Sequence, residues 1–229
     1  MKLSKRGALV LMAEEAISLG AYKDSGGVWT IGIGHTAAAG LPEPKAGLQL
    51  TLSTCIEIFR RDVEKFENRV SQAIKIALTQ HEFDALVLFD FNTGAISVGS
   101  IDDKMNSRNI SAALATWEQY TKAGGKKLQG LVDRRAREIA MFVHAEYSVR
   151  AILLYTAYPK GKSVLNPNLI PWSSEAPKPI ADKPPPDVER AGEKPPADKP
   201  VAGKGVAAFL IGLIMAAIAA AAAYFAGGN

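Results

Sequence analysis

The most informative stretch of this chain is residues 14–35, which read EEAISLGAYKDSGGVWTIGIGH. It begins at the end of an apolar run that follows Ser4, and serine is a preferred residue at the N-cap of a helix. We therefore predict a helix that starts after Ser4 and continues to about Ala16. Gly20 is the expected end of that helical segment, because glycine accepts the left-handed conformation that often closes a helix.

The second half of the stretch has the pattern of a β-hairpin. Residues 24–27 read DSGG, which is a turn signal. From residue 29 to residue 34, apolar side chains alternate with threonine and glycine, which is strand periodicity. Because alternate residues of a strand share a face, Thr30 is expected to lie beside Gly32 and Gly34 on a shallow, open floor. A helix followed by a hairpin indicates a mostly helical α+β fold.

Two carboxyl groups frame this predicted turn. Cleavage of a glycosidic bond needs a pair of carboxyls, one of which gives its proton to the leaving oxygen. Burial of Glu15 at the helix end would keep it protonated, whereas Asp24 in a polar turn would stay ionised. Thr30 could hold a water molecule beside Asp24, across a sugar-sized groove. Taken singly, both carboxyls have ordinary alternatives, namely a solvated helix end and a turn residue. Glu14 is a rival to Glu15, because adjacent helical residues point in different directions and only one can face the groove.

Composition narrows the class of protein. The chain has 229 residues, of which 48% are hydrophobic and 22% are charged, as in ordinary globular proteins. Its net charge of +4 is compatible with attraction to an anionic polymer such as the cell wall. The basic residues are scattered without a nucleic-acid-binding motif, so we expect no nucleic-acid partner. The single cysteine, Cys55, excludes an intrachain disulfide and is expected to be buried. We expect no metal site and no cofactor.

The chain divides into regions of different composition. Residues 1–147 combine mixed charge, periodic apolar residues and turn signals, which indicates a folded domain. Residues 173–204 hold eight of the thirteen prolines among lysines and acidic residues, which is typical of a disordered, extended stalk. The segment between them, residues 148–172, either packs back on the domain or begins the stalk.

The last region, residues 205–227, is predicted to be a transmembrane helix. Residues 206–226 are 21 positions without a charge, and a helix of that length spans about 30 Å, the thickness of a bilayer core. A buried core helix is the alternative. Lysines precede the span and none follows it, so the positive-inside tendency favours a cytoplasmic location for the N-terminal side, with the short C-terminal tail outside.

The spacing Glu15-x8-Asp24-x5-Thr30, together with YKD at 22–24 and WTIGIGH at 29–35, resembles the signature of phage-type lysozymes, glycoside hydrolase family 24. The resemblance implies a lysozyme-like fold and selects Glu15 over Glu14 as the general acid. It also implies that Asp24 positions or activates the attacking water, that Thr30 helps to hold this water, and that the reaction inverts the anomeric carbon. Ala16 stands where the family usually has glycine, and we expect a modest effect from that change.

The resemblance extends over about residues 3–145. Four further segments carry it: 78–87 (LTQHEFDALV), 89–94 (FDFNTG), 122–126 (KAGGK) and 130–138 (GLVDRRARE). They look like the family's central helix, the turn after it, and the approach to and start of its last helix. The arginines at 134, 135 and 137 could bind the anionic glycan, but we expect at least two of them on a solvated helix face.

Three further residues are predicted to bind substrate: Gly32, His35 and Asn92. For His35, structural support of the site is the alternative. For Asn92, the alternative is an amide that caps the end of the central helix.

The function that these patterns predict is that of a muramidase with a monomeric catalytic domain. It would hydrolyse the β-1,4 bond between N-acetylmuramic acid and N-acetylglucosamine in bacterial peptidoglycan and lyse the host cell. One alternative is a membrane-anchored wall-binding module without hydrolytic activity. Another is that the C-terminal helix disrupts membranes as the main activity.

Overall fold

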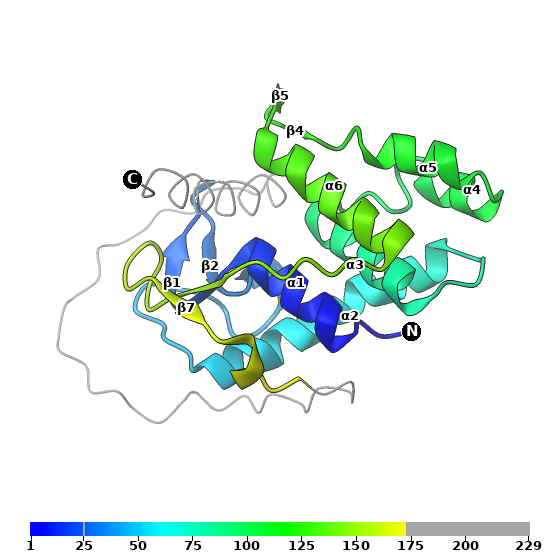
Figure 1. Cartoon of the computed structure of the whole chain (residues 1–229). Coiled ribbons are helices and arrows are strands. Elements are labelled where there is room, and N and C mark those ends of the chain that lie inside the picture. The colour runs from blue at the N-terminus through cyan, green and yellow to red at the C-terminus, as the bar shows by residue number, and fades with distance from the viewer. Residues whose placement is uncertain (25, 173–229) are drawn as a thin grey trace, which may run out of the picture.

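A computed structural model of the chain describes residues 1–24 and 26–172 (Figure 1). The predicted stalk, residues 173–204, and the predicted span, residues 205–227, lie outside these residues. Among the helices of the described residues, none has the length and apolar character needed to cross a membrane.

Six α-helices form the larger part of the regular secondary structure in the described chain. They are α1 (Lys5–Glu15), α2 (Leu52–Ala73), α3 (Gln80–Thr93), α4 (Ile101–Asn106), α5 (Ile110–Trp117) and α6 (Gln129–His144). Short 3-10 turns lie at Ala37–Ala39 and Pro167–Leu169. The buried helix α3 packs on α6, α2 and α1, so it forms the centre of the helical part. The structure confirms the predicted α+β fold with more helix than strand.

Five of the seven strands in the described part of the chain form one sheet. They are β1 (Ile17–Lys23), β2 (Trp29–Gly32), β3 (His35–Thr36), β6 (Ile152–Tyr155) and β7 (Ser163–Leu165), in the order β3-β2-β1-β6-β7. β1 and β2 form the antiparallel hairpin that the sequence predicts. β6 adds to the other edge of β1 in parallel. The remaining pair, β4 (Lys122–Ala123) and β5 (Lys126–Lys127), forms a separate small hairpin before α6.

Helix α1 begins where the sequence predicts. The hydroxyl of Ser4 accepts a hydrogen bond from the backbone N–H of Gly7 at 3.1 Å, which satisfies one of the free donors of the first turn. Ser4 in turn donates from its own N–H and hydroxyl to the fully buried carboxylate of Asp84 on α3. This anchor fixes α1, and the glutamates at its far end, relative to the central helix.

Helix α1 ends close to the predicted position, which was about Ala16, but Gly20 does not close it as predicted. The helix stops at Glu15, and Gly20 lies inside β1 instead of terminating a helix. The chain turns at Ala16, whose N–H still bonds to the carbonyl of Met12 while its backbone has φ 60° and ψ 174°. This conformation is almost restricted to glycine, because a Cβ atom crowds the neighbouring backbone there.

Replacing Ala16 with glycine should stabilise the protein. Strain in this backbone region costs on the order of 1–3 kcal/mol, and the added flexibility of glycine in the unfolded chain costs about 0.5–1 kcal/mol. We expect Ala16→Gly to raise the free energy of unfolding by about 1 kcal/mol, measured by urea denaturation. Ala13→Gly, inside α1, is the control and should lower it. A less stable Ala16→Gly protein would show that the turn carries no strain. From the sequence, the only signal was that Ala16 replaces the glycine usual in the family, and we expected a modest effect from that change.

Residues 148–172 pack back on the domain, which was one of the two possibilities that the sequence left open. We call these residues the strap. From the end of α6 the strap returns beside α1 to the sheet (Figure 1). It buries Ile152, Tyr155 and Ile170, and the ring of Trp172 lies 6.0 Å from that of Phe59 on α2.

Candidate active site

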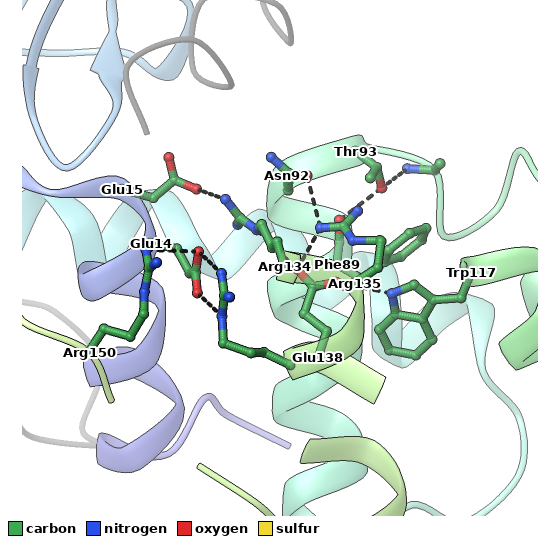
Figure 2. Close-up of polar contacts among 12 residues, drawn as sticks. Glu14, Glu15, Phe89, Asn92, Thr93, Trp117, Arg134, Arg135, Glu138 and Arg150 are labelled. Atoms are coloured by element: carbon green, nitrogen blue, oxygen red, sulfur yellow. Dashed lines mark hydrogen bonds and ion pairs between the residues drawn. The ribbon is translucent and has the colours of Figure 1, made fainter. Parts of the chain in front are cut away.

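The two glutamates at the end of α1 both point toward α6 but meet different arginines (Figure 2). Glu15 is 8% exposed and its Oε1 accepts a hydrogen bond from Nη1 of Arg134 at 2.7 Å. Within residues 1–24 and 26–172, Oε2 of Glu15 has no hydrogen-bond partner, and Figure 2 shows it directed away from the arginines. Glu15 therefore keeps one oxygen free to carry a proton.

Glu14 is paired on both oxygens. Arg137 donates from Nε to Oε1 at 2.8 Å and from Nη2 to Oε2 at 2.9 Å, and Arg150 of the strap lies 3.7 Å from Oε2. Both glutamates are buried against α6. That only one of them faces the groove stays a prediction.

The surroundings shift the acidity of the two glutamates in opposite directions. Burial raises the pKa of Glu15, and the charge and hydrogen bond of Arg134 offset this only in part. Burial acts in the same direction on Glu14, but the charges of Arg134, Arg137 and Arg150 together outweigh it and lower the pKa of Glu14. Glu15 is thus the carboxyl that holds its proton to higher pH.

Arg134 belongs to a buried network that extends into the helical part (Figure 2). Its Nε donates to Oε1 of Glu138 at 3.0 Å, and Nη2 of Arg135 donates to the same oxygen at 2.6 Å. The other oxygen of Glu138 accepts from the indole N–H of Trp117 at 3.0 Å. The network holds Arg134 in place, so it fixes the position of the Glu15 carboxyl.

Asp24 lies at the mouth of the β1–β2 hairpin, where its side chain organises the turn. Its Oδ1 accepts hydrogen bonds from the backbone N–H groups of Gly26 and Val28, each at 2.8 Å. Among the described residues, Oδ2 has no partner. One oxygen therefore fixes the carboxylate and the other remains available as a base.

Thr30 is the cross-strand partner of Tyr22, so both side chains stand on the same face of the hairpin. Thr30 is 3% exposed, and its hydroxyl donates to the carbonyl of Val28 at 3.2 Å. That bond uses the hydroxyl proton and leaves the oxygen able to accept a hydrogen bond from another donor. The side chain of Tyr22 interacts electrostatically with both Glu15 and Asp24. Burial raises its pKa most, and the negative charges of Glu15 and Asp24 add to the shift.

The predicted open floor beside Thr30 is wrong at Gly32. Gly32 has φ +64°, and a Cβ atom built there would lie 3.7 Å from Sγ of the buried Cys55 on α2. The regular alternation of the strand ends at this residue, and that side of Gly32 packs against α2. Contact between Gly32 and substrate stays a prediction.

His35 holds a loop to α2. The ring is 1% exposed, its Nδ1 lies 2.7 Å from Oδ2 of Asp62, and its Nε2 lies 2.9 Å from the carbonyl oxygen of Pro42. Both nitrogens already have a protein partner, which favours the structural alternative for His35. Its contact with substrate stays a prediction.

Asn92 does not cap the central helix. It lies inside α3 and is 2% exposed, and the residue that closes the helix is Gly94, with φ 64°. Oδ1 of Asn92 accepts a hydrogen bond from Nη2 of Arg135 at 2.9 Å, whereas Nδ2 is buried without a partner among the described residues. The amide therefore braces Arg135 and keeps one unused donor. Its contact with substrate stays a prediction.

This arrangement has the parts of an acid–base pair for cleaving a glycosidic bond. A carboxyl with a raised pKa is the donor type that the reaction needs, and a solvent-accessible carboxylate is the base type. No group of three or more histidine, cysteine, aspartate or glutamate side chains in the described chain could hold a metal ion.

Comparison with known proteins agrees with this geometry. The sequence matches the phage lysozyme family over residues 12–138, which is more than half of the chain.

The chain belongs to the phage lysozyme family.

This lysozyme is similar to endolysins of several phages. It is 33% identical over 145 residues to the endolysin of Salmonella phage P22, which covers 62% of this chain and 99% of that protein. It is 35% identical over 146 residues to the endolysin of Bacillus phage PZA, but there the match spans only 55% of the relative. It is also 35% identical over 134 residues to the SAR-endolysin of Pseudomonas phage phiKMV, covering 56% of this chain and 81% of that protein.

Solved structures have the same fold. The endolysin of Escherichia coli O157:H7 phage FAHEc1 superposes with a TM-score of 0.59 at 32% identity, over 65% of this chain and 97% of that one. The muramidase domain of SpmX from Asticaccaulis excentricus superposes with a TM-score of 0.56 at 27% identity, over 62% and 97%. As a member of this family, the lysozyme is a glycosidase that hydrolyses peptidoglycan.

Sequence reasoning missed the arginines of this lysozyme. The expectation that at least two of the arginines at 134, 135 and 137 lie on a solvated face is wrong, because Arg134 and Arg135 are 3% and 1% exposed and Arg137 binds Glu14. Arg134 and Glu15 are 119 residues apart in sequence, and no local pattern links such positions. The only sequence signal for buried arginines was that several charged residues lie close together in α6, among apolar ones.

Proposed function

We propose that this lysozyme hydrolyses the β-1,4 bond between N-acetylmuramic acid and N-acetylglucosamine by direct attack of water, with inversion at the anomeric carbon. The opposite shifts of the Glu14 and Glu15 pKa values carry the proposal. The raised pKa of Glu15 suits a proton donor, whereas the lowered pKa of Glu14 suits a permanently ionised partner in an ion pair.

In the proposed reaction, Glu15 is the general acid. Its free oxygen, Oε2, donates a proton to the glycosidic oxygen as the bond from that oxygen to the anomeric carbon breaks. The carboxylate that remains is left beside the guanidinium of Arg134, 2.7 Å away, which stabilises the new negative charge. Arg134 thereby stabilises the carboxylate that forms, yet it does not ionise Glu15 before the reaction, because burial keeps the pKa of Glu15 raised.

Asp24 is the proposed general base. The attacking water forms the new bond to the anomeric carbon and gives one proton to Oδ2 of Asp24. The hydroxyl oxygen of Thr30 accepts the second hydrogen of that water in a hydrogen bond and so orients it. The two backbone bonds on Oδ1 support this role, because they hold the carboxylate in one orientation.

The stereochemistry of the first product tests the proposed route. Direct water attack on a β-linked glycan releases a new reducing end in the α configuration, whereas a covalent intermediate would release the β anomer. We expect proton NMR of peptidoglycan fragments, recorded in the first minutes of digestion, to show the α anomer before mutarotation. Initial release of the β anomer would contradict inversion.

The proposal includes an anchor in the host inner membrane. Residues 205–227 would span the bilayer, residues 173–204 would form the stalk, and the catalytic domain would lie on the cytoplasmic side before lysis. The uncharged sequence of residues 206–226 supports the span. Three relatives, from Pseudomonas phage phiKMV and Enterobacteria phages PA-2 and P21, carry the name SAR-endolysin.

A charge in the proposed span tests the anchor in the full chain. Arginine at the centre of a membrane helix costs about 2.5–3.5 kcal/mol, so Leu213→Arg should move the protein from the membrane fraction to the soluble fraction. Clearing of purified peptidoglycan should be unchanged, since the substitution lies outside the catalytic domain. A variant that stays in the membrane fraction would refute the anchor, and one that loses hydrolysis would favour the C-terminal helix as the active part.

A further inference from the structure

The strap lies beyond residues 12–138, over which the chain matches its family, yet it is bonded to the strand that joins Glu15 to Asp24. β6 pairs with the start of β1 through Ile17 opposite Leu154 and Ser18 opposite Tyr155. The backbone N–H of Tyr158 donates to the hydroxyl of Ser18 at 3.1 Å, and this hydroxyl donates to the carbonyl of Gly20 at 2.7 Å. The strap therefore fixes β1 along its outer edge.

The contact between strap and strand is close. A Cβ atom at Gly20 would lie 2.8 Å from the carbonyl oxygen of Thr156 and 2.9 Å from Cβ of Ala157. Only glycine allows the two backbones this approach. The segment before Tyr158 thus rests directly on the middle of β1.

This approach brings Tyr158 to the face of the hairpin that carries the proposed site. The ring of Tyr158 lies 4.9 Å from that of Tyr22 and 4.9 Å from that of Tyr155. Tyr22 is the cross-strand neighbour of Thr30 and is two residues before Asp24. Tyr22 therefore contacts the strap through its ring and neighbours the proposed catalytic residues on the hairpin.

We propose that Tyr158 is a positioning residue for glycoside hydrolysis, which acts by packing its ring on Tyr22 and so fixing the hairpin face beside Glu15, Asp24 and Thr30. The inference rests on the proposed catalytic roles of these residues. The ring of Tyr158 also helps to exclude water from this face. Because misplacement of catalytic groups by about 1 Å costs up to 10²-fold in rate, loss of the ring should lower kcat more than it raises KM.

The charged and titratable groups around the site define a second readout. Glu15 interacts electrostatically with Arg134, Glu14 and Glu138. The groups that interact in the same way with Tyr22 are Glu15, Asp24, Tyr155 and Tyr158. Burial is the main cause of the raised pKa of Glu15. If removal of the Tyr158 ring admits water, the alkaline limb of the pH–rate profile should move to lower pH, because the general acid then loses its proton earlier.

The experiment compares full-length Tyr158→Ala, Tyr158→Phe and Ile170→Ala on solubilised peptidoglycan strands, at a temperature where circular dichroism shows all three folded. Ile170 is 2% exposed and lies outside the part of the strap that pairs with β1, so its truncation controls for general loss of stability. We expect Tyr158→Ala to lower kcat roughly tenfold with little change in KM and to shift the alkaline limb. Tyr158→Phe, which keeps the ring, and Ile170→Ala should match the wild type in both.

Two results would overturn the inference. One is a Tyr158→Ala protein with wild-type kcat and pH profile, and the other is an equal loss of kcat in Ile170→Ala. Glu15→Gln, with the strap intact, separates this inference from the proposed function. If that variant is inactive while Tyr158→Ala behaves like the wild type, only the role of Tyr158 fails. If Glu15→Gln stays active, the proposed acid fails first.

Discussion

Glu15→Gln should lower the rate of peptidoglycan hydrolysis by roughly 10²–10⁴-fold, the usual contribution of a general acid. Glutamine has nearly the same shape and can still accept the hydrogen bond that Arg134 donates to Oε1, but it has no acidic proton to transfer to the leaving oxygen. The folded state should survive. Burial disfavours the ionised form of Glu15, so its ionisation does not help to stabilise the fold at neutral pH. The measurement is turnover of purified peptidoglycan, with unfolding followed by circular dichroism.

Glu14→Gln is the matched control one residue away. It makes the same change of side chain at the same helix end, but Glu14 is bonded on both oxygens to Arg137 and has a lowered pKa. Stability from a lowered carboxyl pKa is present at neutral pH and is lost as pH falls, so this variant should be less stable by about 1–3 kcal/mol. It should retain most of its activity. The reverse pattern, with Glu14→Gln inactive and Glu15→Gln active, would move the acid to Glu14.

Asp24→Asn should cost a comparable 10²–10⁴-fold in rate. The asparagine oxygen can accept the same backbone hydrogen bonds from Gly26 and Val28 that hold Oδ1, so the turn should keep its conformation. The NH₂ group that replaces Oδ2 cannot take a proton from water. Turnover on peptidoglycan and an unchanged melting temperature would together assign the loss to chemistry.

The control for Asp24→Asn is Asp103→Asn on α4, which removes one negative charge from an exposed side chain. It tests whether the altered net charge by itself changes action on an anionic wall. We expect Asp103→Asn to act like the wild type. An Asp24→Asn protein that keeps wild-type turnover would exclude Asp24 as the base.

The sequence predicts the local structure around the site well, because this structure depends on neighbouring residues. The start of α1 at Ser4, the turn after Asp24 and the hairpin follow from capping, turn residues and alternation. The helix ends near Ala16 as predicted, but the role given to Gly20 was wrong, since the chain turns at Ala16 itself, in a conformation that alanine rarely adopts. No propensity predicts a turn that packing forces on an unfavourable residue.

The long-range contacts could not be predicted. Arg134, Arg137 and Arg150 converge on Glu14 and Glu15 only after α6 and the strap pack against α1. A charged helix face normally indicates solvent, so burial of these arginines is visible only in the tertiary structure. The same holds for the strap. Its short apolar strand gave no sign that it would extend the sheet beside β1.

Direct titration of the Glu15 side chain tests the central claim, that this carboxyl holds its proton while its neighbour is ionised. Carboxyl carbon shifts of glutamate-labelled protein, recorded from pH 3 to 9 and assigned with Glu15→Gln and Glu14→Gln, would give both pKa values. We predict a pKa above the ordinary glutamate range for Glu15 and below it for Glu14. A pKa for Glu15 at or below that of Glu14 would contradict the assignment of the proton donor.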